Sequence, residues 1–168
     1  MSKVRLATVW LDGCSGCHMS FLDMDMILLD LAPKIDLVYS PLVDFKVFPE
    51  NVDVTIVEGA VSSTEDEEKI KHIRGRTKTL IALGDCAITS NVPGMRNTFS
   101  VDTIMTDAYG PDHPVQVIPP LLDKSVPVHH VVPVDVFITG CPPPAGTIVK
   151  ALLAVLEGQP NPVPPRFG

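Results

Sequence analysis

Apolar stretches long enough to cross a membrane are missing from this sequence. A membrane helix needs about 18 consecutive apolar residues, and no uninterrupted apolar run here reaches that length. The segment Met1–Arg5 leads directly into the first apolar run and shows neither the pattern of a secretory signal nor a twin arginine. We therefore expect a protein without membrane insertion, located in the cytoplasm.

Basic clusters and aromatic side chains are also scarce. The chain has 13 Lys and Arg residues against 20 Asp and Glu, a net charge of −7. It has no Lys/Arg cluster, which argues against nucleic acid as a partner. Aromatic residues make up only 5% of the 168 residues, while 45% are hydrophobic, so aliphatic side chains must form the core. The apolar excess predicts an obligate partner, because permanent interfaces resemble the core of a domain.

Cysteine is limited to four residues, and each one closely follows an apolar run that is typical of a strand. They are Cys14 and Cys17 after Val4–Leu11, Cys86 after Thr77–Leu83, and Cys141 after Val134–Thr139. Ligands of open parallel sheets bind outside the carboxyl ends of the strands. The four thiols are therefore expected to converge on one metal centre. In a reducing compartment, metal ligation is a more common role for them than disulfide formation.

Alternating strand and helix patterns predict the fold class. The expected strands are Val4–Leu11, Ile35–Ser40, Val52–Val57, Thr77–Leu83 and Val134–Thr139. The expected helices are His18–Leu31, a helix capped by Ser62, Ser63 or Thr64 that runs to about Arg74, and a helix from Pro143–Ala145 to Glu157. We expect an α/β protein with a flavodoxin-like, doubly wound, five-stranded parallel sheet in the order 2-1-3-4-5. Residues 1–168 would form a single domain.

Two segments have no clear period. Asn91–Pro133 is too long for an ordinary loop, so it should contain short helices and partner contacts. Residues 159–168 hold four prolines, and we expect this Pro-rich tail to lie extended on the surface.

The four thiols allow several chemical interpretations. A structural zinc site normally uses two Cys-x-x-Cys pairs, whereas this chain has one pair and two isolated cysteines. A thioredoxin-like dithiol would leave two of the four unexplained. Buried free cysteines are common in cores, but that interpretation does not predict four thiols at one sheet edge. Four thiolates suit a 4Fe-4S cluster best; zinc and dithiol chemistry stay open.

The residues beside the cysteines fit cluster-binding loops. Gly13, Gly16, Gly84 and Gly140 allow tight turns and offer backbone N–H groups to sulfur, and Pro142 supplies the Cys-Pro pair that recurs in such loops. We expect these five residues to surround the cofactor.

Four segments together resemble the small subunits of soluble nickel-iron hydrogenases. They are Leu11–Ser20 (LDGCSGCHMS), Val57–Val61 (VEGAV), Gly84–Ala87 (GDCA) and Gly140–Pro143 (GCPP), in the same order as in that family. The likeness runs from residue 4 to about residue 157. Each segment alone is a weak signal, but the set is highly specific.

Differences from other members of the superfamily indicate which hydrogenase group the chain resembles most. The longer membrane-bound and periplasmic small subunits carry a twin-arginine leader and a C-terminal domain with two further clusters, neither of which we expect here. The related complex I subunit has adjacent cysteines in its first loop, whereas two residues separate Cys14 from Cys17. His18 replaces an acidic residue common in uptake enzymes. The chain thus looks most like the bidirectional NAD-reducing group, with F420-reducing and methyl-viologen-reducing small subunits as rivals.

The resemblance implies an electron relay. One proximal 4Fe-4S cluster would be held by Cys14, Cys17, Cys86 and Cys141. A nickel-iron centre on the large subunit would split H2, and a diaphorase module with iron-sulfur clusters and FMN would pass electrons to NAD. The chain would belong to a hydrogen dehydrogenase without containing its catalytic metal. A stand-alone iron-sulfur carrier or redox sensor and a structural zinc module are the alternatives.

Two further residues lie beside the expected ligands. Glu58 ends the third expected strand on the side of the cysteines. A carboxylate there could relay protons from the large subunit, and the alternative is a helix-cap or salt-bridge role. His18 directly follows the first cysteine pair. It either contacts a cluster sulfur or a partner carbonyl, or it simply starts a helix that faces the partner.

Overall fold

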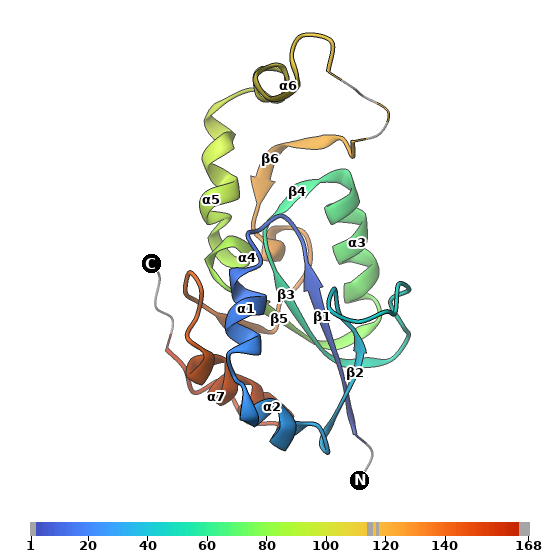
Figure 1. Ribbon diagram of the computed structural model, residues 1–168, viewed down its shortest axis with the longest axis vertical. Coiled ribbons are helices and arrows are strands. Elements are labelled where there is room, and N and C mark those ends of the chain that lie inside the picture. The colour runs from blue at the N-terminus through green and yellow to red at the C-terminus, as the bar shows by residue number, and fades with distance from the viewer. Residues whose placement is uncertain (1–2, 114–115, 117, 165–168) are drawn as a thin grey trace.

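A five-stranded parallel sheet forms the centre of the computed structural model, which describes residues 3–113, 116 and 118–164 (Figure 1). Its strands lie in the order β2-β1-β3-β5-β7. Their bounds are β1 Val4–Trp10, β2 Ile35–Tyr39, β3 Val52–Glu58, β5 Thr77–Leu83 and β7 Val136–Ile138. Taken as five successive strands, this is the expected order 2-1-3-4-5, so the predicted fold class is confirmed.

The central strands are buried on both faces, as expected for a parallel sheet covered by helices. In β3, every residue except Asp53 is buried. It pairs with β1 through Leu6 and Val54 and with β5 through Val57 and Ala82. The near-continuous apolar runs in the sequence arise from this double burial.

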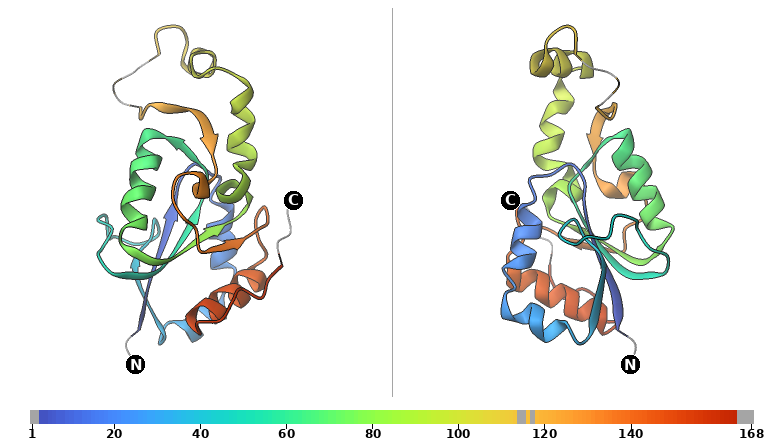
Figure 2. Two further views of the ribbon diagram at one scale, coloured as in Figure 1. Left: turned by 180° about the vertical axis from the view of Figure 1, so that it is seen from behind. Right: turned by 45° about the vertical axis from the view of Figure 1, so that its right-hand side comes forward.

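Helices cover the two faces of the sheet and create two apolar layers (Figure 2). One face carries α1, α2 and α7, and the other carries α3 with α4. Their bounds are α1 Gly16–Leu22, α2 Met26–Leu31, α3 Thr64–Arg74, α4 Asp85–Thr89 and α7 Ala145–Leu156. Ser63 caps α3 in a reciprocal capping box with Asp66. Among the described residues, no helix has both the length and the apolar character needed to span a bilayer.

Two predicted elements differ from the structure by more than one residue. The expected helix His18–Leu31 is two helices, because the chain turns at Asp25, where φ is 50°. Asp favours turns over helix interiors, since its side chain competes for backbone hydrogen bonds. The last strand is shorter than Val134–Thr139, because the Asp135 carboxylate accepts the Leu80 N–H at 2.7 Å and takes the place of a strand-to-strand bond.

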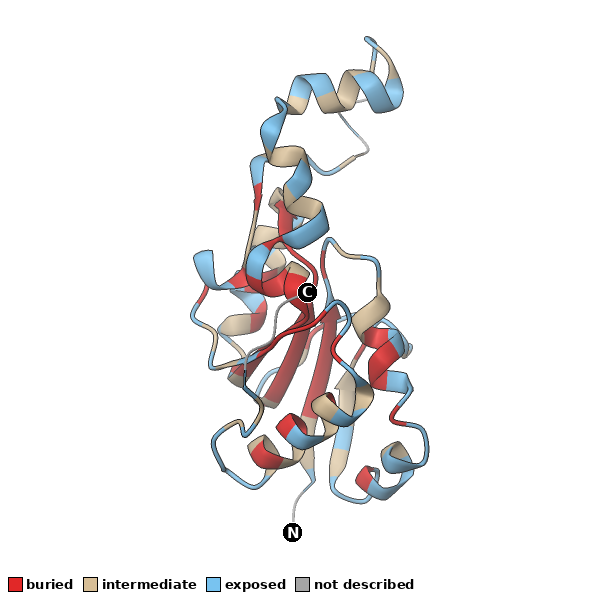
Figure 3. Ribbon diagram, turned by 90° about the vertical axis from the view of Figure 1, so that its left-hand side faces the viewer, coloured by how far each residue is buried: buried red, intermediate tan, exposed pale blue. Residues whose placement is uncertain are grey.

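The segment Asn91–Pro133 contains short helices, as predicted, and also a strand that sequence patterns did not reveal. Its elements are α5 Asn91–Gly94, η1 Met95–Thr98, α6 Val101–Tyr109, β6 Leu121–Val126 and η2 Val128–His130. β6 pairs antiparallel with β4 (Val61–Ser63). Figure 3 shows α5 and α6 projecting beyond the carboxyl ends of the central strands, whereas Val128 of η2 is packed in the core. Whether the segment contacts a partner stays a prediction.

The predicted Pro-rich tail follows α7. Residues 159–164 adopt neither helix nor strand, in keeping with an extended chain, and Asn161 Nδ2 donates to the Phe137 carbonyl at 3.0 Å. The rest of the predicted tail, residues 165–168, lies outside the described residues.

Candidate functional site

All four cysteines line one pocket at the carboxyl edge of the sheet. Cys14 lies in the loop after β1, Cys17 in the first turn of α1, Cys86 in the first turn of α4, and Cys141 just after β7. The pocket has a volume of about 110 Å³. The predicted convergence of the thiols is therefore observed, and it follows from the shared direction of the strands.

Close backbone packing fixes the loop that carries the first cysteine pair. The Asp12 N–H donates to the Ala60 carbonyl at 3.1 Å, and the Ala60 N–H donates back to Asp12 at 2.7 Å. Gly59 has a φ of +88°, and a Cβ there would lie 2.8 Å from the Leu11 carbonyl carbon. Only glycine fits this crossing of the loops after β1 and β3.

Gly84 makes room for one of the thiols. Its φ is +82°, and a Cβ at this position would lie 2.3 Å from Cys17 Sγ. Any larger residue would displace the sulfur or the backbone. Gly84 thus shapes the site, although it does not itself line the pocket.

Asp85 ties the Cys86 loop to the Cys141 loop. This carboxylate, only 4% exposed, accepts the Gly140 N–H through Oδ1 at 2.7 Å. The Asp85 N–H donates in turn to the Gly140 carbonyl at 2.9 Å. Because these bonds are buried and one involves a charged acceptor, they hold the two cysteine loops in register.

Burial raises the pKa of the Cys17 thiol far above its ordinary value, and the Glu58 charge and the other cysteines add to the increase. Burial also raises the pKa of Cys86, which a hydrogen bond from the Val92 backbone N–H partly offsets. Thiolates gathered in such a pocket need a cationic group for charge compensation. Iron ions of a cluster would supply that charge.

The arrangement of the donors bears on which metal centre they could hold. A zinc ion requires sulfur atoms at about 2.3 Å from one centre. Within the described part of the chain, no three His, Cys, Asp or Glu side chains gather closely enough for a single ion. Four thiols around a shared pocket instead fit a multi-iron cluster that binds one thiolate at each iron.

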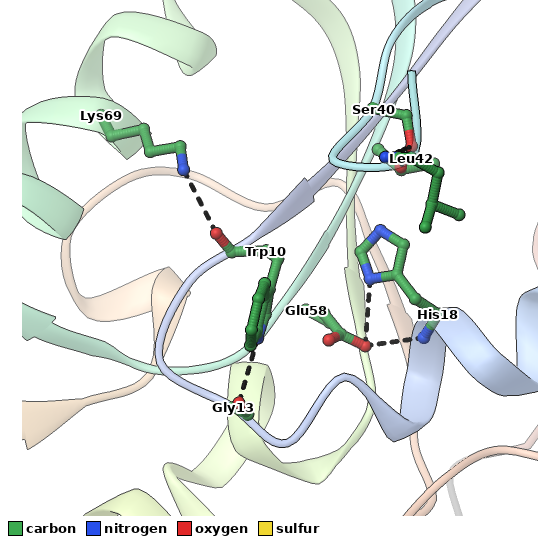
Figure 4. Close-up of polar contacts among 8 residues, drawn as sticks. Trp10, Gly13, His18, Ser40, Leu42, Glu58 and Lys69 are labelled. Atoms are coloured by element: carbon green, nitrogen blue, oxygen red, sulfur yellow. Dashed lines mark hydrogen bonds and ion pairs between the residues drawn. The ribbon is translucent and has the colours of Figure 1, made fainter. Parts of the chain in front are cut away.

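Glu58 and His18 form a buried pair next to the cysteines (Figure 4). The Glu58 side chain is 2% exposed and lines the pocket. Its Oε2 accepts the His18 backbone N–H at 2.8 Å and lies 3.3 Å from His18 Nδ1. His18 Nε2 is buried and has no hydrogen-bond partner among the described residues.

The other predicted site residues fall into two groups. Gly13, Gly16, Gly140 and Pro142 line the pocket with the cysteines. His18 does not line it, because its imidazole faces Glu58. The geometry thus brings most of the expected residues together, and their contacts with a cofactor stay predictions.

One contact was absent from the sequence-based prediction. Asn91 Nδ2 donates to Cys141 Sγ at 3.3 Å, across 50 positions of the chain. The only signal in the sequence was the turn-forming run Ser90-Asn91 soon after Cys86. That run predicts a turn, but it does not show which cysteine the amide reaches.

The sequence of this chain is similar to those of known hydrogenase subunits. The family model of the NADH ubiquinone oxidoreductase 20 Kd subunit matches residues 14–155. The delta subunit of the NAD-reducing hydrogenase HoxS from Cupriavidus necator is 41% identical, over 96% of this chain and 83% of that protein. The F420-non-reducing hydrogenase vhu from Methanococcus voltae has one subunit that is 38% identical over 98% of this chain, which spans only 60% of that relative.

Solved structures show the same fold. A chain of an NAD+-reducing [NiFe]-hydrogenase in the H2-reduced state superimposes with a TM-score of 0.92 at 37% identity, covering 97% of this chain and 96% of that one. A [NiFeSe]-hydrogenase chain from Dm. baculatum shares the fold at a TM-score of 0.58 and 20% identity. It covers 98% of this chain and 67% of that one. Taken with the matching model and relatives, the chain belongs to the NADH ubiquinone oxidoreductase 20 Kd subunit family and, within it, to the hydrogenase small subunits.

Proposed function

We propose that this chain is the small subunit of a nickel-iron hydrogenase and holds one 4Fe-4S cluster that relays electrons. The observation that carries this proposal is the convergence of all four cysteines, from three strand ends, on one pocket. A bound cluster supplies one-electron transfer. The chain's own residues ligate it, exclude water around Cys17 and hold the loops in place.

The electron acceptor is inferred from relatives. The HoxS delta subunit and the NAD+-reducing hydrogenase chain match this chain over nearly its whole length. We therefore propose that a diaphorase module with further clusters and FMN passes the electrons to NAD. Because the relative from an F420-non-reducing hydrogenase is also 38% identical, an acceptor other than NAD is the second candidate.

Exposed apolar side chains support the proposed partners. Met19 and Met26 on the α1–α2 face are 65% and 64% exposed, and Met95 and Phe99 beyond the cysteine pocket are 70% and 62% exposed. Large apolar side chains at this density favour burial against other chains. We assign them to the large subunit and the diaphorase, in an obligate cytoplasmic hetero-oligomer whose small subunit is a single domain over residues 1–168.

Glu58 is proposed to carry protons between the large subunit and solvent. It lines the pocket and faces His18, whose Nε2 has no partner among the described residues. A carboxylate beside an imidazole can accept and return a proton without a large movement. Glu58 would carry the proton, while the four cysteines would hold the group that supplies electron transfer.

Single Cys→Ser variants in the purified large–small subunit complex test the proposed ligands. Each of the four variants should lower the iron and acid-labile sulfide content and the 4Fe-4S signal in electron paramagnetic resonance (EPR). Ser15→Ala is the control in the same loop, since the Ser15 hydroxyl makes no capping bond to α1. Full cluster content in all four cysteine variants would contradict the proposal.

A further inference from the structure

The turn between α4 and α5 brings a hydrogen-bond donor to a cysteine sulfur. Asn91 Nδ2 donates to Cys141 Sγ at 3.3 Å. Cys86 lies on α4, just before this turn, whereas Cys141 follows β7. The turn beside one cysteine loop therefore contacts the sulfur of the other.

The backbone of this turn has an uncommon conformation. Ser90 has a φ of 64° and Asn91 a φ of 28°, a region that non-glycine residues rarely occupy. Such conformations cost free energy and persist where the surroundings hold them, often at functional sites. Here the Ser90 N–H donates to the Cys86 carbonyl at 3.1 Å, and the Gly94 N–H donates to Ser90 at 2.9 Å. The turn is thus anchored to the helix that carries Cys86.

Hydrogen-bond donors to cysteine sulfur change the reduction potential of an iron-sulfur cluster. Reduction adds one negative charge, part of which resides on the sulfur ligands. A hydrogen bond to such a sulfur stabilises the reduced form more than the oxidised form, so it raises the reduction potential. The Asn91 amide carries no net charge, so its effect comes from the bond alone.

We propose that Asn91 is a positioning residue that raises the reduction potential of the cluster on this chain. The inference rests on the proposed function, because it requires a cluster bound by Cys86 and Cys141. A purely structural role would fix the Cys141 loop without changing the potential of a fully assembled cluster.

Redox titration of the cluster, followed by EPR on the purified complex, tests this inference. Asn91→Gly removes the donor and suits the positive φ, so the cluster should assemble with a more negative midpoint potential. Asn91→Asp removes the donor and adds a negative charge, and the shift should be larger in the same direction. The potentials should therefore fall in the order wild type, Asn91→Gly, Asn91→Asp.

Asn51→Gly is the matched control. Asn51 also has a positive φ, 56°, and it precedes β3 at the end of the sheet opposite the cysteines. Its carbonyl accepts a bond from Arg5, which the variant keeps. The potential of this variant should equal that of the wild type.

Four results separate the possible failures. A wild-type complex without a 4Fe-4S signal would overturn the proposed function itself. A normal signal with an unchanged midpoint potential in both Asn91 variants would overturn only the role of Asn91. A shift of the midpoint potential in Asn51→Gly equal to that in Asn91→Gly would do the same. If the Asn91 variants lose the cluster, electron–nuclear double resonance on the wild-type complex with 15N-labelled asparagine amides tests instead whether the Asn91 amide is bonded to the cluster. The inference expects a coupled amide nitrogen, and its absence would refute the inference.

Discussion

His18 Nδ1 lies 3.3 Å from Glu58 Oε2, and the His18 backbone N–H donates to the same oxygen at 2.8 Å. Two residues 40 positions apart thereby join the start of α1 to the end of β3, and one of them, Glu58, lines the cysteine pocket. A carboxylate and an imidazole, both able to carry a proton, therefore lie beside the pocket through which electrons are proposed to pass.

Replacing Glu58 by Gln tests the proton role. The amide keeps the size of the side chain and an oxygen that accepts the His18 N–H, but it cannot carry a proton at neutral pH. We expect hydrogen turnover of the complex to fall by up to about 10²- to 10⁴-fold, with iron content unchanged. H2-dependent dye reduction and H/D exchange measure the effect.

Glu50→Gln is the control for this variant. Glu50 is 67% exposed in its pair with Arg76 and precedes β3, away from the pocket. Loss of the Glu50 charge should leave the hydrogen turnover of the complex unchanged. A Glu58→Gln complex with wild-type turnover would remove Glu58 from the proton path.

Gly84→Ala should lower cluster content. A Cβ there would lie 2.3 Å from Cys17 Sγ, so the sulfur must move. Gly110→Ala is a close match, because Gly110 has a φ of +85° and no atom within 4 Å of its built Cβ. Both variants carry backbone strain of about 1–2 kcal/mol, but only Gly84→Ala should lose iron. Equal iron content in the two variants would argue against the steric role of Gly84.

Asp85→Ala should loosen the Cys141 loop. It removes the buried carboxylate that accepts the Gly140 N–H at 2.7 Å, and leaving such a donor unpaired costs about 1–3 kcal/mol. We expect faster loss of iron to a chelator. Asp85→Asn keeps an oxygen acceptor and should behave more like the wild type. Similar rates for the two variants would show that the acceptor does not matter.

The Asp53–Lys78 pair predicts a pH dependence of stability. The Lys78 ammonium at 2.7 Å and the Arg5 backbone N–H at 2.9 Å hold the pKa of Asp53 below its ordinary value. Because the folded pKa is the lower one, the contribution is present above the unfolded pKa of about 3.9. It is lost as the pH falls through the folded pKa.

Asp53→Asn should therefore lower the free energy of unfolding of the full-length chain by about 1 kcal/mol or less near pH 6. The difference should shrink as the pH falls below 4. Urea unfolding at several pH values measures it, and Lys78→Met, which removes the main partner, should weaken the pH dependence. A wild-type minus Asp53→Asn difference that grows toward acid would contradict the assignment.

The sheet was predictable because strand signals are local. The apolar runs ending near Leu11, Val57 and Leu83 alternate with helical segments, and general rules for parallel sheets then give the strand order. The same rules placed all four cysteines at one edge. The pattern already favoured a 4Fe-4S cluster over zinc or a dithiol, and the family resemblance added what the pattern could not, namely the proximal position of that cluster and the partner subunits.

Features that depend on pairing between distant segments were not predictable. β4 and β6 are short, and β6 carries Asp123 and Lys124 at its centre, so neither has a clear strand pattern. Arg96 holds β4 and β6 together by donating to the Ser62 and Leu122 carbonyls at 3.0 and 2.9 Å. The Asn91–Cys141 bond likewise depends on the folded path of the chain.

The metal and sulfide content of the native complex tests the central claim most directly. The chain would be purified anaerobically from its host with its partners, and nickel, iron, zinc and acid-labile sulfide would be measured together. We predict nickel, together with iron and sulfide in clear excess over it. Zinc without iron or sulfide would contradict the electron-relay function.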